Sequence, residues 1–296
     1  MIRRASGVGL GFDGNGSAGV APGREFIAGG PGRIPGDRSG RWQNPGRPHK
    51  GEWTGPAVAA PPQSSGMAAN RQHVVVTGTG TGVGKTVLSG LLVRRLVRRG
   101  RPVLAFKPLC SGGRDDALHL EAALGGLQSL DEINPWHFDA ALSPALAARL
   151  ERRRVDLAQV LAHVRARAAG AGLVLVEGAG GLLSPLTADG DTRDLILRLR
   201  AIPVLVASNR LGVLHDVRAA LGGLPPSFRQ RAPVVLMDPA KADASTARNA
   251  RCLSEYHPAD HIVEIPRVSG AIQSGASAPS ASLNRRVDRI LALLGA

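Results

Sequence analysis

The sequence of 296 residues contains only two cysteines, Cys110 and Cys252, which excludes a fold held together by several disulfide bonds. We therefore expect a reduced, cytoplasmic setting. Aromatic residues make up only 3% of the chain, too few to build the stacking platforms that bind single-stranded nucleic acids. Long hydrophobic runs are also missing: no apolar stretch approaches the ~20 residues of a membrane-spanning helix, and no compact apolar segment follows the first arginines as in a secretory signal. We expect no membrane partner.

Positive charge, in contrast, is abundant. The formal net charge is +14, a balance that is also found in proteins that bind nucleic acids. The arginines, however, are spread along segments such as 94–99 and 152–154. Solvated arginine faces on helices explain such a distribution more simply. We therefore expect no nucleic-acid partner.

Residues 1–66 do not resemble a folded domain. They are dense in Gly, Pro and Arg and show no apolar periodicity from which a core could form. Met67 stands directly before the first predicted strand. We expect either a disordered extension or, as the favoured interpretation, a misassigned start, with Met67 as the true first residue and 67–296 as a single folded domain.

From Arg71 onward, apolar strands alternate with amphipathic helices. Such an alternation predicts an α/β fold: a mostly parallel sheet of about seven strands with helices on both faces. The glycine-rich loop described below makes the expected fold P-loop NTPase-like. Residues 127–141 and 269–281 are predicted to be loops. The clearest predicted strands are 73–77, 103–106, 173–176, 202–206, 234–236 and 261–265, and the clearest helices 85–99, 115–123, 156–168, 192–200, 245–256 and 285–294.

The glycine-rich stretch Gly78–Thr86 lies between the first strand and the first helix. Its glycines let the backbone N–H groups converge, and the helix start adds its positive dipole end, so the stretch attracts a phosphate. Lys85 can reach the terminal phosphates of a nucleotide, and the Thr86 hydroxyl can bind Mg²⁺. The loop has one more residue than the usual spacing when counted from Gly78. The alternative, a glycine-rich turn with a solvated lysine, does not explain why strand, glycines, Gly-Lys-Thr and helix occur in this order.

Two carboxylates and a second lysine also follow strand ends, where parallel sheets bind their ligands. Glu177 comes directly after four apolar strand residues, and Asp115 and Asp116 follow the strand at 103–106. With Thr86, such oxygens form a donor set for Mg²⁺. The alternatives are a structural salt bridge for Glu177 and a helix N-cap for the aspartates. Lys107 offers positive charge beyond the phosphate loop, unless it is simply an exposed lysine at a strand end.

These residues together resemble the dethiobiotin synthetase family, over roughly residues 72–295. Order and spacing both agree. The most specific parts of the resemblance are Gly78–Thr86, Lys107-Pro108 with Ser111-Gly112, Asp116-Ala117-Leu118, Ser143-Pro144 and Val176–Gly181, and the weaker parts are Arg210–Gly212 and Glu264–Pro266.

The resemblance implies an ATP- and Mg²⁺-dependent ligase of biotin biosynthesis that makes dethiobiotin from 7,8-diaminononanoate and CO₂. An amine takes up CO₂ to give a carbamate, ATP phosphorylates the carbamate, and the second amine closes a cyclic urea as phosphate leaves. Family members are homodimers in which the substrate lies across the interface. Its carboxylate is held at a helix start of the other subunit, here matching Gly212 to Leu214.

The resemblance also implies roles for single residues. Asp116 rather than Asp115 joins Thr86 and Glu177 as a metal ligand. The implied catalytic residues are Lys107, Lys85, Thr81 and Ser111; the implied ATP-binding residues are Gly80, Gly82, Val83, Gly84, Lys85, Thr86 and Val87; and the implied substrate-binding residues are Ser111, Gly180, Gly212, Val213 and Leu214.

The sequence departs from the family pattern at several positions. Met237-Asp238 stand where the family has an Asn that reads the nucleotide base, so we expect a relaxed base preference. Gly80, Ala145 and His215-Asp216 also replace frequent family residues.

Two other functions remain open at this stage. A cobyrinate-amidation-type ligase domain would come with a glutaminase nucleophile, but neither cysteine lies in a nucleophile-elbow context. A partitioning-ATPase-like nucleotide switch would carry an additional lysine early in the loop, where Thr79-Gly80 stand.

Overall fold

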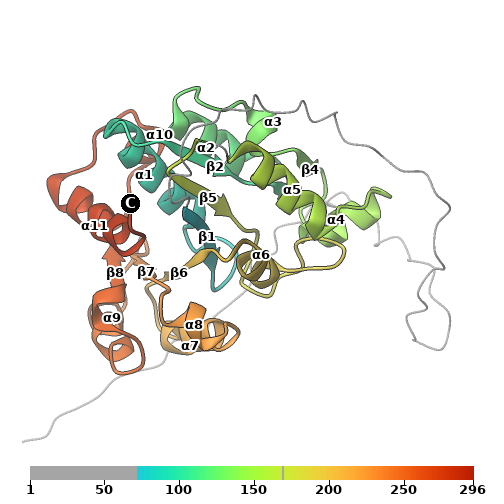
Figure 1. Cartoon of the computed structure of the whole chain (residues 1–296). Helices are drawn as coiled ribbons and strands as arrows, with labels where there is room; N and C mark the ends of the chain where they lie inside the picture. The colour runs from blue at the N-terminus through green and yellow to red at the C-terminus, as the bar shows by residue number, and fades with distance from the viewer. Residues whose placement is uncertain (1–71, 169) are drawn as a thin grey trace, which may run out of the picture. The chain divides into compact units, whose positions relative to one another are not determined.

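The computed structural model describes residues 72–168 and 170–296. The extension expected over 1–66 and the start expected at Met67 lie outside the described residues. The described part is built on one parallel sheet (Figure 1). Its strands, in spatial order, are β2 (Val103–Phe106), β5 (Leu173–Glu177), β1 (Gln72–Gly78), β6 (Ile202–Ser208), β7 (Val234–Met237) and β8 (Ile262–Ile265).

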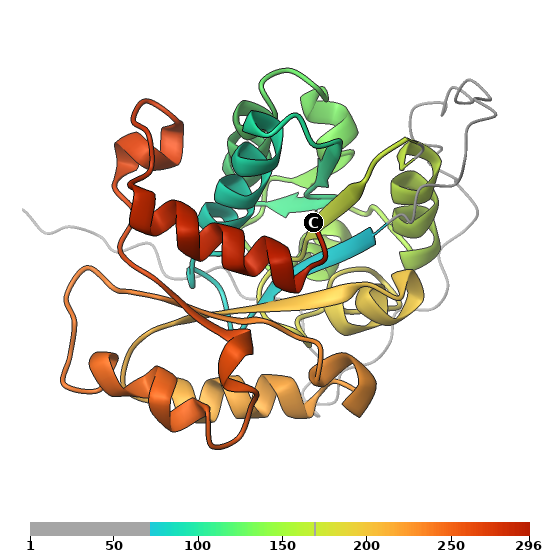
Figure 2. The same cartoon turned by 60° about the vertical axis from the view of Figure 1, so that its left-hand side comes forward.

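Successive residues of the central strand β1 face opposite layers. Val75 packs in one hydrophobic cluster, whereas Val74 and Val76 pack in the other, and all three are completely buried. A strand buried on both faces requires a continuous apolar run, which the three valines supply. The α/β, P-loop NTPase-like fold with helices on both faces is therefore confirmed (Figure 2).

Helices cover the two faces as separate layers (Figure 1). One layer consists of α1 (Lys85–Arg98), α2 (Asp115–Leu124), α11 (Ala281–Leu293) and the short α3 (Leu130–Ile133) and α10 (Gly270–Ser274). The other consists of α4 (Pro144–Leu150), α5 (Leu157–Arg167), α6 (Thr192–Leu199), α7 (Val213–Gly222), α8 (Pro226–Arg229) and α9 (Thr246–Leu253). A 3₁₀ turn, Ala259–His261, leads into β8.

The strand count differs from the prediction. Within residues 72–168 and 170–296 the main sheet has six strands rather than about seven, and two further short strands, β3 (Leu109–Ser111) and β4 (Trp136–Phe138), form a separate parallel pair. Two residues, Lys107 and Pro108, connect β2 to β3 and so lie between the two sheets. The pattern of the sequence did not predict this small sheet.

The segment 127–141, predicted to be a loop, contains α3 and β4. Ser129 and Glu132 form a capping box that starts α3, and Trp136 and Phe138 are buried. The segment lies along the open edge of β2: the Gln128 side chain accepts a hydrogen bond from Ala105 N (2.7 Å), and Ile133 O accepts one from Lys107 N (3.0 Å). Its polar side chains thus take the place of a neighbouring strand.

The segment 269–281 was also predicted to be a loop, but it contains α10, which Ser269 caps. Arg94 of α1 donates hydrogen bonds to the carbonyls of Ile272 and Gln273 at the end of this helix. The terminal helix α11 begins at Ala281 rather than 285, because Ser280 caps it. Side-chain caps and a distant arginine, rather than periodicity, set these bounds.

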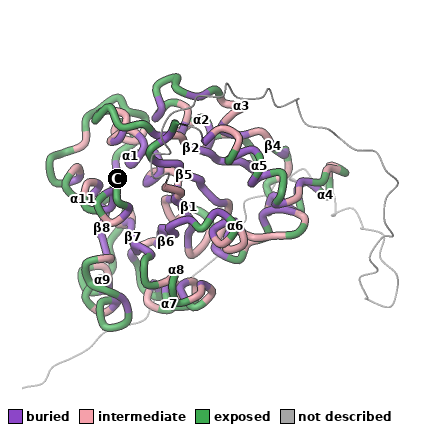
Figure 3. Tube along the Cα trace, in the orientation of Figure 1, coloured by how far each residue is buried: buried purple, intermediate pink, exposed green. Residues whose placement is uncertain are grey.

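Burial follows the layers: the strands are buried and the outer helix faces exposed (Figure 3). None of the helices within 72–168 and 170–296 is both long and apolar enough to cross a membrane.

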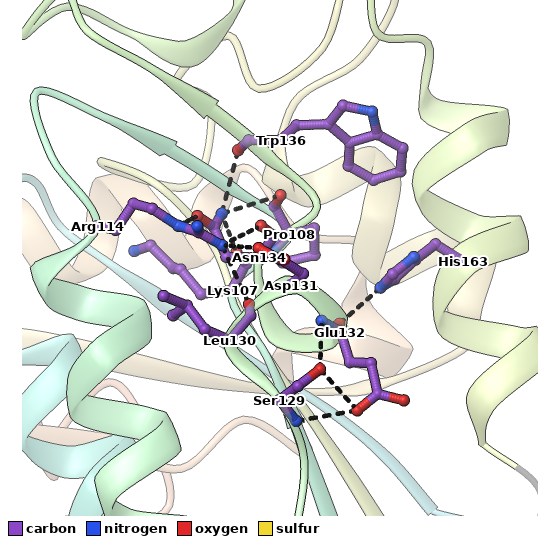
Figure 4. A network of polar contacts seen from close by, with 10 residues as sticks. All are labelled: Lys107, Pro108, Arg114, Ser129, Leu130, Asp131, Glu132, Asn134, Trp136 and His163. Carbon is purple, nitrogen blue, oxygen red and sulfur yellow. Dashed lines mark hydrogen bonds and ion pairs between the residues drawn. The ribbon is translucent and has the colours of Figure 1, made fainter. Parts of the chain in front are cut away.

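His163, a buried residue of α5, packs against β2 and β4. The ring of His163 makes edge contacts with Phe106 and Trp136, at centroid distances of 5.7 and 5.6 Å. Its Nε2 donates to the carbonyl of Glu132 (2.7 Å, Figure 4), and its Nδ1 accepts from Arg167 (3.1 Å). This arrangement fits a neutral ring, and burial lowers the pKa of His163 below its ordinary value of 6.5.

His163 should therefore destabilise the protein at acidic pH. Because the pKa of His163 is lower in the folded chain, the unfolded chain binds a proton first as the pH falls through 6.5. The contribution of the neutral, buried ring to the free energy of unfolding is therefore present above pH 6.5 and is lost below it. Urea unfolding at pH 7 and pH 5 should show a smaller loss of stability for His163→Gln than for the unaltered chain. An equal loss in both proteins would contradict the prediction.

Candidate active site

The loop between β1 and α1 has the conformation of a phosphate-binding loop. Gly82 and Gly84 have positive φ values of 73° and 99°, which L side chains rarely adopt. Gly84 is the N-cap of α1, and the Lys85 Nζ folds back to donate to Gly80 O (2.8 Å). Burial, followed by the nearby charge of Lys107, lowers the pKa of Lys85 to about 8. The loop thus holds a lysine over the N-terminus of a 14-residue helix.

Three oxygen-bearing side chains converge beside this loop. The Thr86 Oγ1 lies 2.7 Å from Asp116 Oδ1 and 2.7 Å from Glu177 Oε1. A hydroxyl has one hydrogen and can donate to only one of these oxygens at a time. Asp115, in contrast, is exposed and does not line the cavity described below. The structure therefore places Asp116, and not Asp115, beside Thr86 and Glu177.

Lys107 joins the same cluster from the end of β2. Its Nζ lies 2.9 Å from Glu177 Oε1, from Asp116 Oδ2 and from Gly178 O, and its side chain is only 3% exposed. Burial alone would lower the pKa of Lys107, but the two carboxylates outweigh it and raise the pKa. For Asp116, burial acts to raise the pKa, and Lys107 reverses the effect and lowers it. Lys107 is therefore a buried, ion-paired cation and not an exposed lysine at a strand end.

The oxygen cluster fits a divalent cation. Glu177 is 1% exposed, and its Oε2 is buried without a hydrogen-bond partner. Such an orphaned carboxylate oxygen is costly unless a cation binds it. In the described part of the chain no group of three or more His, Cys, Asp or Glu side chains gathers, so no metal cage made of protein ligands alone is present there. Two carboxylates and a hydroxyl are the type of partial site that Mg²⁺ completes with phosphate oxygens and water.

A cavity of about 740 Å³ opens over these groups. Its volume is within the range of small-molecule sites. The predicted residues that line it are Thr81, Gly82, Gly84, Lys85, Thr86, Val87, Lys107, Ser111, Asp116 and Gly180. Of the other predicted residues, Gly80 and Val83 belong to the loop itself. Glu177 does not line the cavity but contacts Thr86 and Lys107, which do.

The far wall of the cavity was largely missed by sequence reasoning. It is formed by Leu109, Cys110, Ala141, Leu142 and Pro144, with Ser143 between them. Only the Ser143-Pro144 pair carried a recognisable pattern. Ser111 Oγ donates to Leu142 O (2.6 Å), so this wall is joined to the end of β3. Burial raises the pKa of the Cys110 thiol to about 11, which makes it a poor nucleophile at neutral pH.

The predicted substrate residues Gly212, Val213 and Leu214 do not line this cavity. They form the start of α7, with Gly212 as N-cap at φ 94°. The preceding loop is fixed by Asp243, whose Oδ2 accepts from Leu211 N (2.9 Å). The structure therefore does not bring this helix start together with Lys85 and Lys107 within one chain.

Met237 and Asp238, which stand at the position implied for reading the nucleotide base, both have neighbours within the chain. The Asp238 Oδ1 accepts a hydrogen bond from the buried Asn209 amide (2.8 Å). The Met237 side chain lies beside the phosphate loop: a Cβ added at Gly84 would lie 3.0 Å from its Cγ. A thioether and an already engaged carboxylate offer little to distinguish one base from another.

Comparison with known proteins agrees with this geometry. A family model described as an AAA domain matches residues 72–273. The ATP-dependent dethiobiotin synthetase BioD of Caulobacter sp. (strain K31) is 42% identical over 171 residues, which are 55% of this chain and 74% of the relative. The protein of the same name from Anaeromyxobacter sp. (strain Fw109-5) is 37% identical over 199 residues, 66% of this chain and 84% of the relative.

The solved structure of the MinD cell division protein of Aquifex aeolicus aligns with 76% of this chain and 97% of its own length. The two sequences are 14% identical in this alignment, and the TM-score is 0.46. The two sequence relatives, in contrast, are matched over most of their own length, and the matched region of the family model contains the phosphate loop, Lys107, Asp116 and Glu177. The chain belongs to the family of ATP-dependent dethiobiotin synthetases.

Proposed function

We propose that this protein is a dethiobiotin synthetase: an ATP- and Mg²⁺-dependent ligase that converts 7,8-diaminononanoate and CO₂ to dethiobiotin, with ADP and phosphate as the other products. The observation that carries the proposal is the pair of lysines at one cavity. Lys85 lies at the phosphate loop and Lys107 at the carboxylate cluster. The reaction brings an anionic carbamate to an anionic phosphate, and two cations at this point oppose their repulsion.

The chain's own residues have separable tasks in this reaction. The backbone of Gly80–Gly84 and the Lys85 ammonium hold the nucleotide phosphates, while Lys107 holds the carbamate oxygen that attacks the γ-phosphorus. Thr81 and Ser111 donate hydrogen bonds to the carbamate or to the transferred phosphoryl group, and the backbone of Gly180, which lines the cavity, contacts the substrate. Phosphate then leaves as the second amine attacks the carbamoyl carbon, which closes the cyclic urea.

Mg²⁺ would be held by Thr86, Asp116 and Glu177. When bound, it neutralises charge that develops on the phosphate oxygens. The orphaned Glu177 Oε2 supports this assignment, because a buried carboxylate oxygen needs a cation or a donor.

A homodimer is part of the proposal, with the start of α7 from a second copy, Gly212 to Leu214, holding the substrate carboxylate. These residues do not line the cavity of their own chain, which agrees with a contribution from a partner. Exposed leucines near the far wall of the cavity support an interface there: Leu142, Leu146 and Leu150 recur every four residues and are 43%, 40% and 63% exposed.

The proposal is tested by incubating the protein with 7,8-diaminononanoate, bicarbonate, ATP and Mg²⁺ and looking for dethiobiotin by mass. Dethiobiotin should appear with one ADP for each molecule formed, and omission of the diamine should abolish both. ATP hydrolysis that is independent of the diamine, without dethiobiotin, would instead indicate a nucleotide switch.

Lys85→Ala and Lys107→Ala should each lower turnover by about 10² or more, on the order of removing a preorganised electrostatic group. Their stabilities should differ. Lys85 donates to Gly80 O, whereas Lys107 pairs with the buried Glu177, and breaking a buried pair leaves an uncompensated charge. Thermal unfolding should therefore shift markedly only for Lys107→Ala. Near-normal turnover of Lys107→Ala at saturating ATP, measured well below its melting temperature, would show that Lys107 does not act on the carbamate.

Base choice should be relaxed. The phosphate loop holds the triphosphate through backbone groups that do not contact the base, and loss of one discriminating hydrogen bond is worth ~1–1.5 kcal/mol. GTP and CTP should therefore give kcat/KM within about tenfold of ATP. Met237→Asn, which introduces an amide that both donates and accepts, should increase the preference for ATP. A preference of the unaltered chain for ATP above about a hundredfold would mean that other groups read the base.

A further inference from the structure

Lys107 lies beyond the end of β2, where the main sheet no longer holds the backbone. The pairing of β2 with β5 ends at Phe106, opposite Val176. β2 is the edge strand, so Lys107 and Pro108 have no strand on their other side. The position of the Lys107 ammonium therefore depends on what binds the backbone of these two residues.

Asn134 supplies most of this binding (Figure 4). It is completely buried, and its Nδ2 lies 2.8 Å from Lys107 O, 3.2 Å from Pro108 O and 3.1 Å from Trp136 O. The neighbouring Ile133 carbonyl accepts from Lys107 N (3.0 Å). Both backbone groups of Lys107 are thus held by two consecutive residues.

Arg114 fixes the other side of Asn134. Its Nε donates to Asn134 Oδ1 (3.0 Å), and its Nη2 lies 2.9 Å from Asn134 O and 3.3 Å from Leu130 O. A guanidinium can only donate, so the amide of Asn134 must present its oxygen to Arg114 and its nitrogen to the carbonyls of Lys107 and Pro108. Arg114 therefore also determines the orientation of the amide.

Arg114 is at the same time the N-cap residue of α2, two residues before Asp116. Its carbonyl accepts the first hydrogen bond of the helix, from Leu118 N (2.9 Å). One arginine side chain thus connects the helix start that carries Asp116 to the amide that holds Lys107. The two connected side chains meet in the site, where Lys107 Nζ lies 2.9 Å from Asp116 Oδ2.

We propose that Arg114 and Asn134 are positioning residues, which set Lys107 and Asp116 relative to each other for phosphoryl transfer to the carbamate. The identity of the reaction in this inference rests on the proposed function, whereas the contacts of Arg114 and Asn134 do not depend on it. Displacement of a reacting group by about 1 Å can cost about 10²-fold in rate. Outer partners of metal-binding side chains typically contribute about 10- to 100-fold to affinity or activity.

The test compares Arg114→Lys with Arg95→Lys. Arg95 is a matched control, because it forms two 2.8 Å hydrogen bonds with Asp288, is 26% exposed where Arg114 is 21% exposed, and lies in the last part of α1 away from the cavity. A lysine cannot reproduce the planar fork of donors at either position. Both variants should therefore melt at a lower temperature than the unaltered protein.

Only Arg114→Lys should alter the site. The readout that does not need the diamine is ATP binding, measured by calorimetry in EDTA and in Mg²⁺. In Arg114→Lys, we expect the gain in ATP affinity on adding Mg²⁺ to be smaller than in the unaltered protein by about threefold or more. The Kd for ATP in EDTA should stay within about twofold of that of the unaltered protein, since Arg114 does not hold the phosphate loop. In the synthetase assay, kcat should fall about tenfold or more.

The inference is overturned if Arg114→Lys, like Arg95→Lys, lowers the melting temperature but keeps the Mg²⁺-dependent gain within about twofold. Arg114 would then have a structural role alone. If the unaltered protein makes no dethiobiotin, the proposed function fails, whereas the binding experiment still decides for or against the positioning role.

Discussion

The site depends on one buried ammonium group. Transferring an unpaired lysine into a protein interior is costly, and Lys107 is only 3% exposed. Burying the negative charge of Glu177, which is almost completely buried, is costly for the same reason. Each charge is tolerated because the other is 2.9 Å away. Lysine and carboxylate therefore stabilise each other, and the elements that carry them must be held where the pair can form.

The parallel sheet provides this placement. Phe106, the last residue of β2, is in register with Val176 of β5. Lys107, which follows β2, and Glu177, the last residue of β5, therefore come side by side at the same edge of the sheet. β1 pairs with the other side of β5, which brings the phosphate loop beside them. Adjacent parallel strands are ~4.8 Å apart, so Lys107, Glu177 and the phosphate loop lie close together as soon as their strands end. The fold fixes the order of these groups, and the helices then fix their separation.

The sequence predicted the groups that follow strand ends, because apolar strands and glycine-rich turns are local patterns. It did not predict the segment 127–141, whose Gln128 and Asn134 are buried although both are polar. Their function is to satisfy backbone groups of β2 and of Lys107, residues distant in sequence. Polarity is typical of loops, and only the tertiary structure shows that these amides replace a strand. The start of α7 was recognised only through the resemblance, which implies that it acts from another subunit; no local pattern of the sequence shows its distance from the cavity of its own chain.

The donor count of Lys107 constrains how the proposed reaction uses it. An ammonium group has three hydrogens, and Glu177, Asp116 and Gly178 O provide three acceptors at 2.9 Å. A carbamate oxygen can bind Lys107 only if one acceptor moves away. Glu177 is almost completely buried, whereas the Asp116 side chain is 48% exposed and lies in the first turn of α2. Asp116 is therefore the partner that can be exchanged at least cost, and a cation that binds Asp116 would free one Lys107 hydrogen for the substrate.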